Sequence, residues 1–117
     1  MNKETIRIYY NPHCSKCRDT VALVRERGYT AELIEYLATP LSKTGLRDLL
    51  KKLDMKPLEL IRKGEEIFKQ NYAGCSLSDD EWLDAMVAHP VLMERPVVVR
   101  GNKAVIARPP ENVLALL

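Results

Sequence analysis

The sequence lacks the features that define several classes of protein. No apolar run in its 117 residues approaches the roughly 20 residues that a membrane-spanning helix requires. The first residues, Met1 to Thr5, contain neither the apolar segment nor the small-residue cleavage site of a signal peptide. The formal net charge is only +2, and 18 Lys and Arg residues are interspersed with 16 Asp and Glu residues, which argues against nucleic-acid binding. We therefore expect a cytoplasmic protein that binds neither a membrane nor nucleic acid.

Cysteine is scarce, and its number limits what it can do. Three cysteines cannot all pair within one molecule, and cytoplasmic thiols are kept reduced. Under those conditions the C-x-x-C spacing of Cys14 and Cys17 favours redox or metal chemistry over a structural disulfide. A zinc site formed by Cys14, Cys17, Cys75 and His89 would have a recognised ligand spacing in only one half. We therefore expect no metal site, and we interpret Cys75 as structural or incidental.

The apolar patterns predict one domain with a defined order of elements. Residues 6, 8 and 10 alternate with more polar positions, as in a half-buried strand, and residues 17, 21 and 24 share one face of a helix. Gly101-Asn102 suits a two-residue hairpin turn. Repeats and low-complexity segments are absent. The predicted elements are a strand at 6–10, a helix at 15–27, a strand at 31–36, helices at about 42–53, 57–62 and 78–88, strands at 97–99 and 104–107, and a final helix at 110–117.

This order predicts an α/β fold. A strand, helix and second strand of this length imply a parallel pair with a right-handed crossover. The whole order resembles a thioredoxin-like mixed sheet with a helical insertion, at about residues 40–90, between its two halves, and we expect residues 1–117 to form a single domain. In that fold a cis-proline faces the reactive cysteine, and only X-Pro bonds adopt cis at modest cost. Arg95-Pro96 is the candidate.

Cys14 is the candidate nucleophile because it lies where the first strand passes into the first helix. A helix N-terminus and nearby cations, here His13, Lys16 and Arg18, favour the thiolate. The alternative is that Cys14 is a small buried apolar residue. Cys17 falls on the apolar face, so it is either a core cysteine or a resolving thiol within disulfide reach one helical turn away. We expect the internal disulfide to form when Cys14 is oxidised.

Three arginines lie beside helix ends or prolines: Arg62, Arg95 and Arg108. From their spacing alone, surface ion pairing is the better interpretation, and such pairs contribute little to stability. Together with a thiolate, however, several guanidinium groups would suit a tetrahedral oxyanion, because their planar forks bind such oxygens in pairs and neutralise the charge.

Four separated motifs resemble the glutaredoxin-dependent arsenate reductases, the ArsC family. They are Asn11-Pro12-x-Cys14-Ser15-x-x-Arg18, Leu60-Ile61-Arg62-Lys63, His89-Pro90-x-Leu92-x-x-Arg95-Pro96 and Arg108-Pro109. The chain ends soon after the last predicted helix, as the shorter members do. The resemblance implies a catalytic Cys14, oxyanion binding by Arg62, Arg95 and Arg108, and supporting roles for Arg18, Asn11 and Pro96. His13, which the motif does not specify, is a candidate to replace a family histidine that this chain lacks. It also implies a monomer without a bound cofactor, with arsenate as substrate, glutathione as co-substrate, and glutaredoxin or thioredoxin as reductant.

Two positions depart from the family pattern. Tyr10 replaces a histidine that helps to lower the pKa of the cysteine, and Cys17 replaces a serine or threonine. The second change resembles the related Spx-type regulators, whose C-x-x-C pair is a redox switch. Two alternatives therefore stay open beside the enzyme, namely a redox-sensing regulator and a general thioredoxin-like disulfide reductase. The arginines favour arsenate reduction, because a switch needs two thiols but no oxyanion site.

Overall fold

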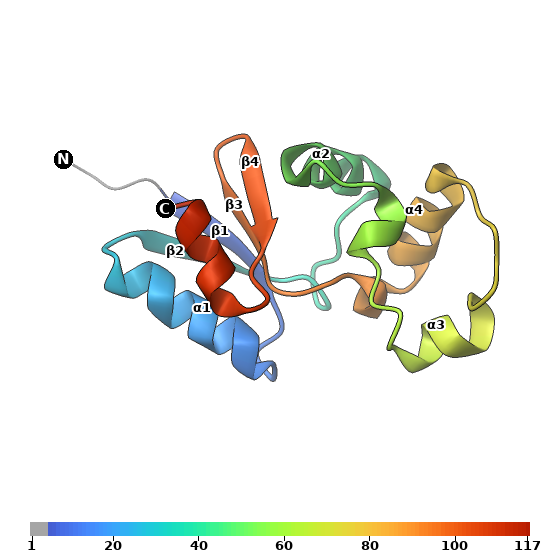
Figure 1. The fold of residues 1–117 in the computed structure, drawn as a ribbon, viewed down its shortest axis with the longest axis horizontal. Coiled ribbons are helices and arrows are strands. Elements are labelled where there is room, and N and C mark those ends of the chain that lie inside the picture. The colour runs from blue at the N-terminus through green and yellow to red at the C-terminus, as the bar shows by residue number, and fades with distance from the viewer. Residues whose placement is uncertain (1–4) are drawn as a thin grey trace. The chain divides into compact units, whose positions relative to one another are not determined.

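The structure is a computed structural model that describes residues 5–117 (Figure 1). The prediction about the N-terminal segment therefore falls largely on residues 1–4, outside the described part of the chain. The chain divides into two units, one of Met1–Thr39 with Arg95–Leu117 and one of Pro40–Glu94. The second unit covers the segment where the sequence predicts helices, while the single domain over residues 1–117 stays a prediction. No helix within residues 5–117 is long and apolar enough to cross a membrane.

The first unit is built on a four-stranded mixed sheet. Its strands are β1 (Thr5–Tyr10), β2 (Thr30–Glu35), β3 (Val97–Arg100) and β4 (Lys103–Ile106), in the order β2-β1-β3-β4. β1 and β2 are parallel and joined by α1 (Ser15–Glu26), whereas β3 pairs antiparallel with both β1 and β4. Gly101 turns the β3–β4 hairpin with a φ of 60°. The α/β class and the thioredoxin-like mixed sheet are confirmed.

α1 and a C-terminal 3-10 helix, η3 (Pro110–Ala115), pack against the sheet (Figure 1). α1 buries one stripe of its surface and ends where Gly28 adopts a left-handed conformation with a φ of 85°, as its position after the helix predicts. The core residues of this unit come from the strands, α1 and η3: Ile6, Ile8, Val21, Val24, Val98, Ala107, Val113 and Leu116. This core fixes the start of α1, where Cys14 lies.

Two details of the first unit differ from the sequence predictions. The last element is a 3-10 helix that ends at Ala115 rather than a helix to Leu117. Pro110, Val113 and Leu116 are all buried, and their spacing of three residues matches the three residues per turn of a 3-10 helix. Tyr9, expected on the polar face of β1, is only 6% exposed, so the burial of β1, an inner strand of the sheet, does not alternate at this end as predicted.

The second unit is helical throughout. It contains α2 (Lys43–Leu53), η1 (Pro57–Leu60), α3 (Glu66–Asn71), α4 (Asp79–Ala88) and η2 (Pro90–Leu92). The Ser42 hydroxyl accepts a hydrogen bond from the Gly45 N–H at 3.0 Å and so caps α2 as predicted. Ser78 and Glu81 form the predicted capping box of α4. α3 was not predicted.

Candidate active site

Cys14 is the N-cap residue of α1 and is partly buried. The preceding loop is shaped by Asn11, whose carbonyl accepts the Cys14 N–H at 3.0 Å and whose side-chain oxygen accepts the His13 N–H at 2.9 Å. One turn into the helix, Arg18 Nη1 donates to the Pro12 carbonyl at 3.3 Å. The loop is therefore held by hydrogen bonds between residues close in sequence, and Cys14 lies at the positive end of the helix dipole.

The environment of Cys14 lowers the pKa of its thiol to about 7. Burial by itself raises this pKa, but hydrogen bonds from the Cys17 side chain and backbone, and from the Arg95 and Arg108 side chains, outweigh burial. From the sequence, the cations expected to lower the pKa of Cys14 were His13, Lys16 and Arg18. The structure instead brings Arg95 and Arg108 to the sulfur from the start of β3 and the segment after β4.

The pKa of the Cys17 thiol is shifted in the opposite direction, upward. Its side chain is fully buried, and burial raises the pKa of its thiol to about 12. A hydrogen bond from the Asn11 backbone acts against burial but is smaller. Cys14 and Cys17 are both free thiols joined by a side-chain hydrogen bond, in which the protonated Cys17 donates to the Cys14 thiolate. The prediction that Cys17 lies on the apolar side of α1 agrees with this burial.

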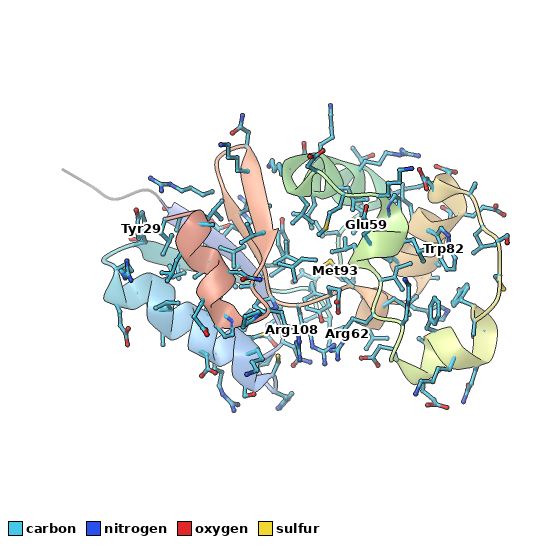
Figure 2. All side chains as sticks on the ribbon, in the orientation of Figure 1. Tyr29, Glu59, Arg62, Trp82, Met93 and Arg108 are labelled. Atoms are coloured by element: carbon cyan, nitrogen blue, oxygen red, sulfur yellow. The ribbon has the colours of Figure 1, made fainter. Side chains whose placement is uncertain are left out.

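Arg95 and Arg108 are also joined to each other. Arg108 Nη1 donates to the Arg95 carbonyl at 3.0 Å. The Arg95-Pro96 bond is cis, as predicted, and the Arg108-Pro109 bond is also cis, which was not predicted. Figure 2 shows Arg108 on the segment that follows β4. Two of the three arginines proposed for the oxyanion site are therefore joined to each other, and both lower the pKa of the candidate nucleophile.

Arg62 belongs to the second unit, where both its backbone and its side chain make contacts. Its N–H donates to the Leu92 carbonyl at 2.7 Å, beside a bridge between Ile61 and Met93. Its side chain lies between two carboxylates, with Nη1 3.6 Å from Glu65 and Nε 3.4 Å from Glu94. Nη1 is buried and has no hydrogen-bond partner. That Arg62 shares one anion with Arg95 and Arg108 stays a prediction.

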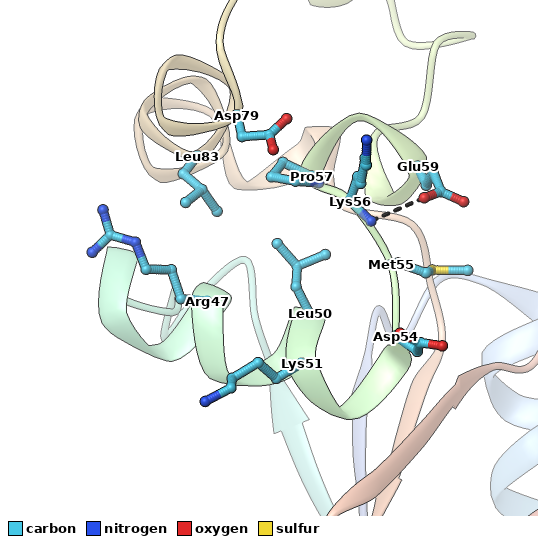
Figure 3. A pocket seen from close by; sticks show the side chains of 10 residues that line it. All are labelled: Arg47, Leu50, Lys51, Asp54, Met55, Lys56, Pro57, Glu59, Asp79 and Leu83. Carbon is cyan, nitrogen blue, oxygen red and sulfur yellow. Dashed lines mark hydrogen bonds between the residues drawn. The ribbon is translucent and has the colours of Figure 1, made fainter.

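The second unit also contains Cys75 and a cavity. Cys75 is exposed, and its thiol contacts the Asn71 carbonyl at 3.7 Å. Within residues 5–117 no group of three or more His, Cys, Asp or Glu side chains could hold a metal ion. A cavity of about 580 Å3 lies in the second unit between α2, η1 and α4, with Leu50 and Leu83 in its wall (Figure 3). None of the predicted site residues lines it.

Asn112 was missed by the sequence analysis. It lies in η3, and its side-chain nitrogen donates to the Ile106 carbonyl at 3.4 Å and to the Arg108 carbonyl at 3.2 Å. Asparagine after a pair of prolines is a turn signal, because its side chain bonds nearby backbone groups. That signal was available, but it does not reveal that the backbone it binds belongs to Arg108.

Comparison with known proteins shows the family of this chain. A sequence model of the ArsC family matches residues 9–116. The chain is 40% identical to an arsenate reductase of Haemophilus influenzae over 94% of its own length and 97% of the relative's, and 48% identical to an uncharacterized protein, YfgD, of Escherichia coli over 96% of each. An arsenate reductase structure from Vibrio cholerae, 42% identical, superposes with a TM-score of 0.95 over 99% of this chain and all of that one. The chain belongs to the ArsC family.

Proposed function

We propose that this protein is an arsenate reductase, a thiol oxidoreductase that converts arsenate to arsenite with Cys14 as its nucleophile. The observation that carries the proposal is a thiol with a pKa of about 7 that receives hydrogen bonds from two arginine side chains. Two relatives indicate that the substrate is arsenate, because they are named arsenate reductases and are 40% and 42% identical to this chain over nearly their full length. The thiolate is the reactive form of cysteine, and about half of Cys14 is ionised near neutral pH.

The first step is attack of the Cys14 thiolate on arsenic. A sulfur–arsenic bond forms, and one arsenate oxygen leaves as water after it gains protons. Arg95 and Arg108 both lower the pKa of the Cys14 thiol through their side chains, which supports a role for them in binding the arsenate oxygens and neutralising charge as the nucleophile approaches. We assign Arg62 to the same anion on the resemblance to the ArsC family alone, since Arg62 belongs to the second unit and its side chain lies between Glu65 and Glu94.

The second step reduces the arsenic. A second thiolate attacks the Cys14 sulfur, the sulfur–arsenic bond breaks, and its electron pair stays on arsenic, which leaves as arsenite. A disulfide on Cys14 remains. We propose that glutathione and glutaredoxin return it to the thiol, which assigns the protein to the reducing cytoplasm, where these reductants are available.

The test is arsenate-dependent oxidation of NADPH, coupled through glutathione, glutaredoxin and glutathione reductase, with a parallel assay through thioredoxin and its reductase. The full-length protein should support turnover, and Cys14→Ser should abolish it. Cys75→Ser is the matched control, because Cys75 is exposed and lies in the other unit. No arsenate-dependent oxidation in either assay, from protein with a free Cys14 thiol, would contradict the proposal.

A second candidate function follows from the hydrogen bond between Cys14 and Cys17. That contact places two thiols as in a C-x-x-C disulfide reductase. The same preparation can be tested with a disulfide substrate, such as oxidised glutathione or a disulfide-bonded protein, in place of arsenate. Turnover of disulfides without turnover of arsenate would favour the disulfide reductase, and a stable oxidised form without turnover of either would favour a regulator.

A further inference from the structure

The segment that carries Arg108 is bound by a side chain from η3. Asn112 Nδ2 donates to the carbonyl oxygens of Ile106 and Arg108, at 3.4 and 3.2 Å. Both partners are acceptors, so only the NH2 end of the carboxamide can make these contacts, and the orientation of the side chain is chemically determined. Asn112 thus joins the end of β4 to the backbone of Arg108.

η3 is a rigid support for this contact. Val113 is fully buried in the core of the first unit, and Leu116, one turn later, is 9% exposed. Arg100 Nη1 also donates to the Leu116 carbonyl at 2.9 Å, and its guanidinium lies over the Tyr29 ring at 5.2 Å. The helix is therefore held to the first unit by Val113 and Leu116, which directly follow the position from which the Asn112 side chain extends.

The backbone of Arg108 determines where two guanidinium groups lie. Its N–H donates to the Ile106 carbonyl at 3.0 Å, which turns the chain after β4. From this turn the Arg108 side chain reaches the Arg95 carbonyl at 3.0 Å, and the side chains of both arginines lower the pKa of the Cys14 thiol. A displacement of the Arg108 backbone would therefore change the contacts of both arginines with Cys14.

We propose that Asn112 is a positioning residue for the Cys14 site, which holds the Arg108 backbone so that Arg108 and Arg95 converge on the nucleophile. Asn112 itself touches neither the sulfur nor the anion. The inference rests on the proposed function only in taking Cys14 as the reactive group. Supporting contacts of this kind decide how precisely a site is held, because the groups that bind substrate are otherwise free to change rotamer.

The experiment measures the alkylation rate of Cys14 against pH and the affinity for sulfate, in a Cys75→Ser background so that the exposed thiol does not react. Asn112→Ala should raise the midpoint of the pH profile by roughly half a unit and weaken sulfate binding by roughly two- to fivefold, as for the loss of part of a hydrogen bond to a charged group. Asn112→Leu, which keeps the volume without the N–H groups, should act in the same way. Asn112→Gln, which keeps them, should recover part of the loss.

The matched control is Asn102→Ala, the same substitution at an exposed position in the hairpin turn, at the opposite end of β3 and β4 from Arg95 and Arg108. It should leave both measurements unchanged. The inference is overturned if folded Asn112→Ala and Asn112→Leu keep the parent's midpoint and sulfate affinity, or if Asn102→Ala shifts them equally. Neither readout uses arsenate, so shifted midpoints in a protein that reduces no arsenate would support Asn112 and contradict the proposed function.

Discussion

At Cys14, burial and hydrogen bonding act on one sulfur in opposite directions. Burial disfavours the thiolate, while the bonds from Cys17, Arg95 and Arg108 favour it, and the balance lowers the pKa to about 7. At Cys17, three residues later, burial prevails and raises the pKa to about 12. Two chemically identical side chains thus differ because one is placed at the helix N-terminus and the other is turned into the core.

Alkylation of Cys14 should follow a titration with a midpoint near pH 7, because the thiolate is the reacting species. The pKa lies below the ordinary thiol value of about 8.5, so the rate at pH 7 should be more than tenfold that of a solvent-exposed peptide thiol of equal intrinsic reactivity. Mass-spectrometric quantification of alkylated Cys14 in a Cys75→Ser background measures it. A midpoint at or above the ordinary value of about 8.5 would contradict the proposal that Cys14 is an activated nucleophile.

Replacement of Arg95 or Arg108 by Ala should weaken oxyanion binding by roughly 1.5–3 kcal/mol, the range for hydrogen bonds to charged groups. Arg108 is exposed, so solvent screening places it at the lower end. Both variants should also raise the pKa of Cys14, since each removes a bond that lowers it. Lysine should rescue poorly because it lacks the planar fork. Sulfate titration and alkylation profiles measure the two effects.

Arg62→Ala should change sulfate binding without changing the pKa of Cys14. The hydrogen bonds that lower the pKa of Cys14 come from Cys17, Arg95 and Arg108, so the loss of Arg62 should weaken sulfate binding while the alkylation midpoint stays near 7. The control is Lys63→Ala, an exposed cation adjacent in the sequence. Unchanged sulfate binding in Arg62→Ala would return this arginine to an ion pair with Glu65 and Glu94.

Among the elements, those with a repeated apolar pattern were predictable and those without one were not. α1 and α2 follow a period of 3.6 and β1 a period of 2 as far as Ile8, while β3 is a short continuous apolar run, and these patterns act locally. α3 has six residues and no buried side chain; it is held by ring contacts such as that of Phe68 with Trp82 at 6.0 Å, between residues far apart in sequence. The same limit applies to the site, because the spacing of Arg95 and Arg108 does not reveal that they meet at Cys14. Resemblance to a family supplied that grouping, and it contained no information about Asn112.

Ser78→Ala should destabilise the second unit by about 1 kcal/mol, because it removes the hydroxyl that accepts the Glu81 N–H at 3.2 Å. Trp82 is the single tryptophan of the chain and is 4% exposed in this unit, so its fluorescence reports the unfolding of that unit in urea. Ser76→Ala, an exposed serine outside the helix, is the control. Equal midpoints for the two variants would show that the cap does not contribute measurably.

At the scale of the whole molecule, the choice of reductant depends on which thiol reaches Cys14 after arsenate binds. Free glutathione has an ordinary thiol, whereas burial raises the pKa of Cys17 to about 12, roughly 3.5 units higher. At neutral pH the thiolate fraction of Cys17 is therefore about 3,000-fold smaller. Well-oriented intramolecular groups, however, reach effective concentrations of about 10⁵ M or more. Even after correction for its smaller thiolate fraction, the effective concentration of the Cys17 thiolate at Cys14 exceeds that of the thiolate of millimolar glutathione. A hydrogen bond also joins the Cys17 side chain to Cys14.

We therefore expect a single turnover with arsenate and glutathione to yield an internal Cys14–Cys17 disulfide, which glutathione and glutaredoxin then reduce. Mass spectrometry of the quenched protein should show the loss of two hydrogens and no glutathione adduct. Cys17→Ser should instead accumulate a glutathione adduct on Cys14 and should turn any thioredoxin-supported activity into a glutaredoxin-dependent one, because the mixed disulfide is then the only intermediate. A stable glutathione adduct in the parent, or an unchanged reductant preference in Cys17→Ser, would leave Cys17 as a core residue whose hydrogen bond stabilises the Cys14 thiolate.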